Sequence, residues 1–176
     1  MTPHPQPATD PADGVVEQRD GRTVLRFQRR LRHPIERVWA ALTEPARLGE
    51  WLAEAELDPT VGGAVRLRWL NSDDEGNQAV MDGSVTALDP PRLLEISGEP
   101  HGVLRFELAE DGDGTRLVLT VTPPTADGID LALPGWHIHL EHLDAALDGR
   151  PVDWAHWARD HRPRWEALHD AYAARG

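Results

Sequence analysis

The chain of 176 residues contains no cysteine, and its 18 basic residues include no lysine. Without cysteine there are no disulfides, no thiol nucleophile and no thiolate metal site. Without lysine, Schiff-base chemistry and a phosphate-loop lysine are excluded. No apolar run approaches the ~20 residues of a membrane-spanning helix. Since the N-terminus also lacks the basic start and apolar core of a signal peptide, we expect a cytoplasmic protein.

Positive charge is scarce, and the formal net charge is -12. Nucleic acid and anionic membrane would both be repelled by this surface, so we expect neither as a partner. Hydrophobic residues make up 40% and charged residues 27%, a balance that is typical of a folded globular chain. The length suits one domain of ordinary size.

Three segments differ in composition. Residues 1–14 hold several prolines among small and polar residues, so we expect a disordered tail there. Residues 15–150 carry the patterns of one domain. In residues 151–176, Asp153 can cap a helix and Pro163 can kink or restart it. We expect this extension to pack on the domain through Trp154, Trp157 and Trp165.

Strand-like alternation of apolar and polar residues dominates the domain. It covers residues 22–31, where Leu25 and Phe27 share a face, and it recurs over 64–70, 78–88, 92–97, 103–108 and 115–122. Residues 15–19 can begin the pairing. Two short helices are expected between Pro34 and Leu52. Tight turns between successive strands indicate an antiparallel sheet of about six or seven strands.

A long helix is expected over residues 129–150. Trp136, Leu140, Leu143 and Leu147 recur at helical spacing, and Gly149 then Pro151 mark its end. Because this helix follows the run of strands, we expect the sheet to close over it, which predicts an α+β fold.

Five segments, in this order, resemble those of a known family. They are residues 33–43 running on to Trp51, residues 61–63, residues 83–94, Phe106 with the Gly114-Thr115 hairpin, and Gly135-Trp136. Together they resemble the START/Bet v 1-like (SRPBCC) superfamily, and within it the activator of Hsp90 ATPase homologue 1-like domain family.

The resemblance implies a helix-grip fold. In such a fold a curved antiparallel sheet wraps around a long C-terminal helix, two short helices follow the first strand, and a cavity lies between sheet and helix. It does not imply one activity. The chain has no room for the separate N-terminal domain of eukaryotic Hsp90 activators, which argues against chaperone activation.

Apolar residues dominate the faces that we expect to surround the cavity. The predicted ligand-binding residues are Leu25, Phe27, Trp69, Met81, Val85, Phe106, Leu119, Trp136, His139, Leu140 and Leu143. His139 is the one polar member. It is either a core histidine bonded to a backbone carbonyl or a polar anchor for a ligand.

Four residues of the long helix suggest a metal site at first sight. Helical phase places His137 and Glu141 on one face, and His139 and His142 on another. Zinc needs three or four convergent ligands, so we expect solvated or core-rim histidines, no metal and no cofactor. No nucleophilic serine motif or pair of buried acids is present, so no catalytic residue is predicted.

Three functions remain open. The first is binding of a small hydrophobic or aromatic molecule in the cavity. The second is a cyclase- or hydratase-like enzyme that uses the same cavity, with His139, Arg29 or Asp82 as acid or base. The third is a co-chaperone-like protein-interaction module, or a homodimer, that uses the acidic surface or the Trp-rich C-terminus.

Overall fold

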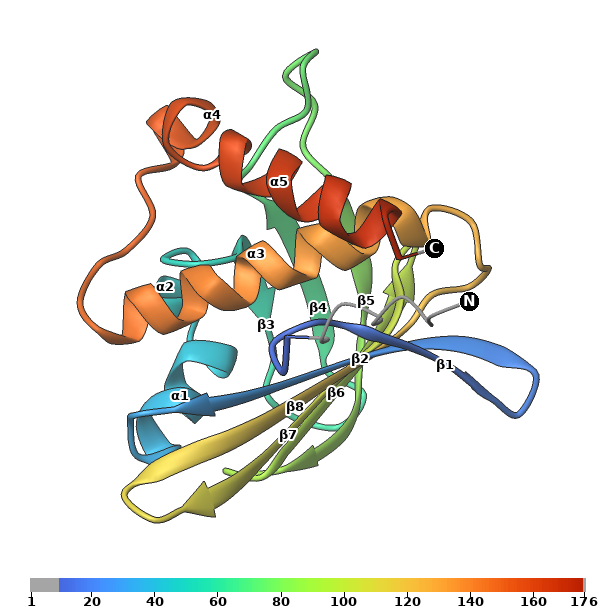
Figure 1. Cartoon of the computed structure of the whole chain (residues 1–176). Helices are drawn as coiled ribbons and strands as arrows, with labels where there is room; N and C mark the ends of the chain where they lie inside the picture. The colour runs from blue at the N-terminus through green and yellow to red at the C-terminus, as the bar shows by residue number, and fades with distance from the viewer. Residues whose placement is uncertain (1–9, 176) are drawn as a thin grey trace, which may run out of the picture.

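The computed structural model describes residues 10–175, so residues 1–9 of the predicted tail lie outside the described residues. Eight strands form one antiparallel sheet in the order β1-β2-β8-β7-β6-β5-β4-β3. The long helix α3 lies across one face of this sheet (Figure 1). The strands are β1 (Val15–Arg19), β2 (Arg22–Leu31), β3 (Ala53–Leu57), β4 (Ala64–Trp69), β5 (Val80–Asp89), β6 (Leu93–Glu99), β7 (Gly102–Asp111) and β8 (Gly114–Thr122). The helices are α1 (Ile35–Thr43), α2 (Pro45–Leu48), α3 (Ile129–Leu147), α4 (Trp157–Asp160) and α5 (Arg162–Ala173), with a 3₁₀ turn over Trp154–His156.

The helix-grip prediction is confirmed, with one strand that the sequence analysis missed. Strand β3 spans Ala53–Leu57 and pairs with β4 at the edge of the sheet. Its sequence alternates alanine with glutamate, and both residue types favour helices in isolation. Paired with β4, the side chains alternate as in a strand: Ala53 is buried while Glu54 points outward to Arg68.

Strand pairing brings distant parts of the chain together in the middle of the sheet. β2 lies between β1 and β8, with Phe27 opposite Leu119. The inward residues of these strands join α3 in one hydrophobic core. Gly83 of β5 lies so close to β6 that a Cβ atom would approach the Ser97 carbonyl oxygen to 2.0 Å. The register of β5 then shifts between Val85 and Ala87, a bulge two residues after this glycine.

Helix α3 is buried on almost all sides, which corrects the expected amphipathic helix. It begins after Gly128 (φ 79°) and is followed by Gly149 (φ 82°), two glycines in the left-handed region. Its sheet-facing stripe packs as predicted, but its opposite side is covered by α5 (Figure 1). Consequently His137 and His142, expected to be solvated or at the rim of the core, are 3% and 4% exposed.

The segment after α3 returns along it, with α5 antiparallel to α3 (Figure 1). The indole Nε1 of Trp154 donates to the carbonyl oxygen of Gly49 at 2.8 Å. Trp157 and Leu168 pack on Ile138 of α3 in a small second hydrophobic cluster. The helical segment breaks at His161, and the first turn of α5 contains a proline, Pro163. No helix within residues 10–175 has the length and apolarity needed to cross a membrane.

Candidate functional site

A pocket of about 680 Å³ opens where the β4–β5 loop faces the start of α3 and the C-terminal helices. Its apolar walls come from β4, the β4–β5 loop and the helices α3, α4 and α5, and its rim is polar. The apolar residues are Trp69, Ala79, Leu131, Trp157 and Trp165. The polar residues are Asn71, Ser72, Asp73, Asp74, Asn77, Gln78, Arg162 and Glu166. An apolar hollow with a few polar groups at its edge is the usual form of a small-molecule site.

The β4–β5 loop is organised around the carboxylate of Asp73. This carboxylate accepts hydrogen bonds from the backbone N–H groups of Glu75 (2.9 Å) and Asn77 (2.8 Å) and from the Asn77 side-chain amide (3.1 Å). The bonds from Asn77 lower the pKa of Asp73. Asp73 is therefore charged at neutral pH, and the loop has a defined shape on the rim of the pocket.

Aromatic contacts fix the wall of the pocket. Trp69 ends strand β4 and stacks on His101, with ring centroids 4.5 Å apart and planes 15° apart. Trp69 also makes a T-shaped contact with Trp136, with ring centroids 6.1 Å apart. Trp157 is held through its indole Nε1, which donates to His142 Nε2 at 3.0 Å. Because their neighbours hold both indoles, the wall is largely preformed.

Two polar features of the rim come from different elements. Arg162 of α5 makes an ion pair with Asp74 of the loop, so this pair joins the C-terminal helix to the sheet. Asn71 presents a side-chain oxygen, Oδ1, that is buried and has no hydrogen-bond partner. Buried acceptors usually have a partner, so this oxygen is an exception that a suitable donor would satisfy.

The eleven predicted ligand-binding residues are all between 0% and 7% exposed and lie in or beside the main core. Trp69 is the member that lines the 680 Å³ pocket. Trp136 and His139 lie behind it in a chain of ring contacts, with centroids 6.1 Å and 6.3 Å apart. The others fill the space between sheet and α3: Leu25, Phe27, Met81, Val85, Phe106, Leu119, Leu140 and Leu143.

His139 is bonded to a backbone carbonyl, as the first of its two interpretations expects, and its other ring nitrogen is what the second interpretation, a polar anchor, would use. Its Nδ1 lies 2.7 Å from the carbonyl oxygen of Gly135. Since a carbonyl only accepts, Nδ1 carries the proton and Nε2 is left as a buried acceptor without a partner. Burial lowers the pKa of His139 to about 4, against the opposing effect of this hydrogen bond. The imidazole is therefore neutral at pH 7.

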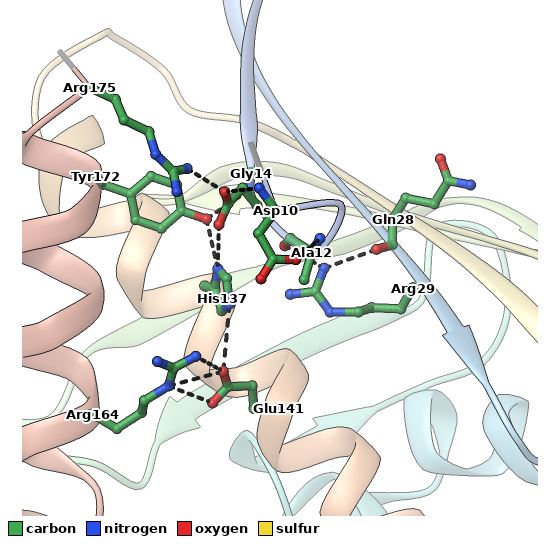
Figure 2. A network of polar contacts seen from close by, with 11 residues as sticks. Asp10, Ala12, Gly14, Gln28, Arg29, His137, Glu141, Arg164, Tyr172 and Arg175 are labelled. Carbon is green, nitrogen blue, oxygen red and sulfur yellow. Dashed lines mark hydrogen bonds and ion pairs between the residues drawn. The ribbon is translucent and has the colours of Figure 1, made fainter. Parts of the chain in front are cut away.

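A second polar cluster lies away from the pocket, where α5 and the N-terminal segment meet α3 (Figure 2). His137 Nδ1 lies 2.7 Å from the Tyr172 hydroxyl, and His137 Nε2 lies 3.5 Å from Glu141. The backbone N–H of Gly14 donates to the same hydroxyl at 2.7 Å. Burial acts to raise the pKa of Glu141, but its bonds with His137 and Arg164 lower it to about 2. The cluster joins three distant parts of the chain.

The predicted acid and base candidates do not converge. Asp82 lies on the outer side of β5 and pairs with Arg66 at 3.3 Å, because the alternation that turns Met81 inward turns Asp82 outward. Arg29 donates to the carbonyl oxygen of Ala12 at 2.6 Å. The suggestion that Asp82 could act inside the cavity is therefore wrong. Within residues 10–175 no three histidine or carboxylate side chains are grouped so that they could hold a metal ion.

Much of the pocket was not anticipated from the sequence. From the sequence, we expect no strand over residues 71–77, between two alternating segments, and we expect Trp157 and Trp165 to pack the extension on the domain. One feature of the sequence indicates that this loop borders a cavity: it directly follows the inward-facing Trp69. A loop that leaves the sheet beside an inward indole must lie at the mouth of any cavity behind that indole.

A curved antiparallel sheet that holds a long helix against one face defines the helix-grip class of START/Bet v 1-like proteins. Within that class the chain belongs to the family of activator of Hsp90 ATPase homolog 1-like proteins, whose family model matches residues 32–148. Residues 149–175 follow this match, so Trp157, Arg162 and Trp165 are pocket residues outside the family match.

Solved structures agree with this assignment. A protein from Rhodobacter sphaeroides is 27% identical with a TM-score of 0.65; the match covers 78% of this chain and 99% of that one. CalU16 from Micromonospora echinospora is 25% identical with a TM-score of 0.64, covering 89% and 97%. Protein MLL2253 from Mesorhizobium loti is 28% identical with a TM-score of 0.61, covering 73% and 99%. Among curated proteins, none matches this chain significantly.

Proposed function

We propose that the protein binds a small hydrophobic or aromatic molecule at the Trp69 end of the space between sheet and α3. The observation that carries this proposal is a pocket of about 680 Å³ with three indoles in its wall. Ligand pockets are typically ~300–1,000 Å³ and are lined mainly by apolar and aromatic side chains. Large flat rings that their neighbours hold in place provide contact area at low entropic cost.

The other ligand-binding residues that the sequence predicts lie deeper than Trp69, and we include them in the proposed site as its floor. Trp136 and His139 form the first layer, because they follow Trp69 in the chain of ring contacts. The unpaired Nε2 of His139 makes this residue a hydrogen-bond acceptor within an apolar surrounding. That is the chemistry of a polar anchor that orients a ligand.

Binding is favoured over the two alternatives. An enzyme of the cyclase or hydratase kind needs an acid or base at the cavity; Asp82 faces outward, and His139 with a pKa of about 4 is a weak base. A protein-interaction role through the C-terminus would use an exposed tryptophan stripe. Trp157 is instead 6% exposed, and Trp154 and Trp165 are partly covered.

Filling the pocket tests the proposal. Ala79 lines it, and its side chain is exposed, so Ala79→Trp adds bulk to the hollow without disturbing the core. A matched control is Ala109→Trp, on an exposed position of β7 outside the pocket. We expect ligands that raise the melting temperature in a hydrophobic library to bind Ala79→Trp at least tenfold more weakly by calorimetry, and to bind Ala109→Trp like the unchanged protein. A library without any binder, or equal binding to Ala79→Trp, would contradict the proposal.

A further inference from the structure

Several polar groups around the pocket already have partners. Nη1 of Arg162 is paired with Asp74, and the Gln78 amide donates to the carbonyl oxygen of Leu70 at 3.2 Å. The Asn77 amide donates to Asp73.

Acceptors, by contrast, are available. Asn71 Oδ1 is buried without a partner. The carboxylate of Glu166, on α5, forms no ion pair with any residue between 10 and 175 in the structure. A buried acceptor without a donor is an energetic cost to the empty protein, and a ligand that supplies an N–H group removes it.

Charge points in the same direction. Three carboxylates line the pocket, those of Asp73, Asp74 and Glu166, against the single cation Arg162. The chain as a whole carries a formal net charge of -12. A cleft of one sign concentrates ligands of the opposite sign, and its low-dielectric walls strengthen the effect. An anionic ligand would meet repulsion both on approach and in the site.

The walls favour a cation for an independent reason. Trp69, Trp157 and Trp165 present indole rings, and the face of an indole attracts a positive charge within about 6 Å more strongly than other aromatic rings do. Trp157 uses its only polar hydrogen on His142, outside the pocket. Its contribution to a ligand is therefore its π face and its apolar area.

Building on the proposed function, we propose that the ligand of this pocket is an arylalkyl amine in its ammonium form. The ring system packs among the three indoles. The ammonium group donates to Asn71 Oδ1 and faces the carboxylates of Asp73 and Glu166. The selectivity arises because a neutral molecule of the same shape leaves the carboxylates uncompensated, and an anion opposes them.

Three ligands that share one ring separate this idea from the proposed function: 1-naphthylmethylammonium, 1-naphthylmethanol and 1-naphthoate. Calorimetry at pH 7 and low salt should give at least tenfold tighter binding for the ammonium than for the alcohol, with the carboxylate weakest. High salt should reduce this ratio, because the charges at the rim are screened. If none of the three binds, the proposed function fails. If the alcohol or the carboxylate binds as tightly as the ammonium, binding stands and the amine preference is refuted.

Substitutions at the rim test whether its polar groups cause the preference for the ammonium ligand. Glu166→Gln removes one carboxylate from an exposed position and should lower the ammonium-to-alcohol ratio about threefold. Glu110→Gln makes the same charge change at the end of β7, away from the pocket, and should leave the ratio unchanged. Asn71→Leu should weaken the ammonium at least fivefold while 1-methylnaphthalene, which has no donor, binds as before. A ratio that is equal in Glu166→Gln and Glu110→Gln would overturn the assignment.

Discussion

Lowering the pH from 7 to 5 should destabilise the protein through two buried histidines of α3. Burial lowers the pKa of His139 to about 4. Burial, together with the charges of His139 and His161, lowers that of His142 to about 3. Both groups have a pKa of 6.5 in an unfolded chain. Between pH 6.5 and pH 4 the unfolded chain therefore binds more protons than the fold, and stability falls as the pH falls.

The magnitude follows from these values. A histidine whose pKa is about 4 in the folded protein lowers the free energy of unfolding by about 2 kcal/mol when the pH falls from 7 to 5. His142 lowers the free energy of unfolding by a similar amount. Part of the shift in its pKa comes from the charge of His139, so the two contributions are not fully additive. The two together should remove about 3 kcal/mol, and His101, whose pKa burial also lowers, adds in the same direction. Domains are stable by only about 5–15 kcal/mol, so the loss is large.

Urea unfolding at pH 7 and pH 5, at one ionic strength, measures this loss. His139→Asn keeps a side-chain N–H near the Gly135 carbonyl but cannot titrate, so its loss should be about half that of the unchanged protein. His156→Asn is the control: bonding to Asp153 raises the pKa of His156, so its removal should not reduce the loss. A loss below about 1 kcal/mol, or an identical loss in His139→Asn, would refute the reasoning.

Two further predictions concern the C-terminal helices. Truncation after Arg150 should lower the melting temperature by calorimetry, because Trp157 and Leu168 lose burial that contributes about 2–3 kcal/mol each; an unchanged melting temperature with lost self-association would mark the segment as an interface. Tyr172→Phe leaves His137 Nδ1 and the Gly14 N–H without their shared partner and should cost about 1–3 kcal/mol in urea unfolding. A cost below about 0.5 kcal/mol would mean that water replaces the hydroxyl.

Most of the fold could be predicted from the sequence because the alternation of a strand is visible within a few consecutive residues. Alternation around Leu25 and Phe27 places both side chains on the buried face. Alternation failed to reveal β3 because alanine and glutamate also suit helices, and only the pairing with β4 decides between the two. The helical period of α3 predicted one buried stripe but not the second, because Tyr172, which covers His137, lies 35 residues further along the chain.

The candidate site was only partly predictable for the same physical reason. Trp69 could be placed because its strand alternates, and it lies on the pocket. Arg162 and Asp74 meet through an ion pair between two elements whose relative position depends on tertiary packing alone. No period or spacing encodes such a contact. The position of the pocket therefore depends on α4 and α5, which no strand or helix pattern of the domain specifies.

The position of β2 between β1 and β8 also sets an order of events during folding. The first hairpin, β1–β2, can form early, but its inner edge pairs with β8 alone. Until residues 115–121 of β8 have been synthesised, that edge lacks its native partner. Loop closure over so much chain is slow and leaves an open strand edge exposed meanwhile. The sheet is thus completed at its interior by the last strand to leave the ribosome, and α3 can settle on it only afterwards.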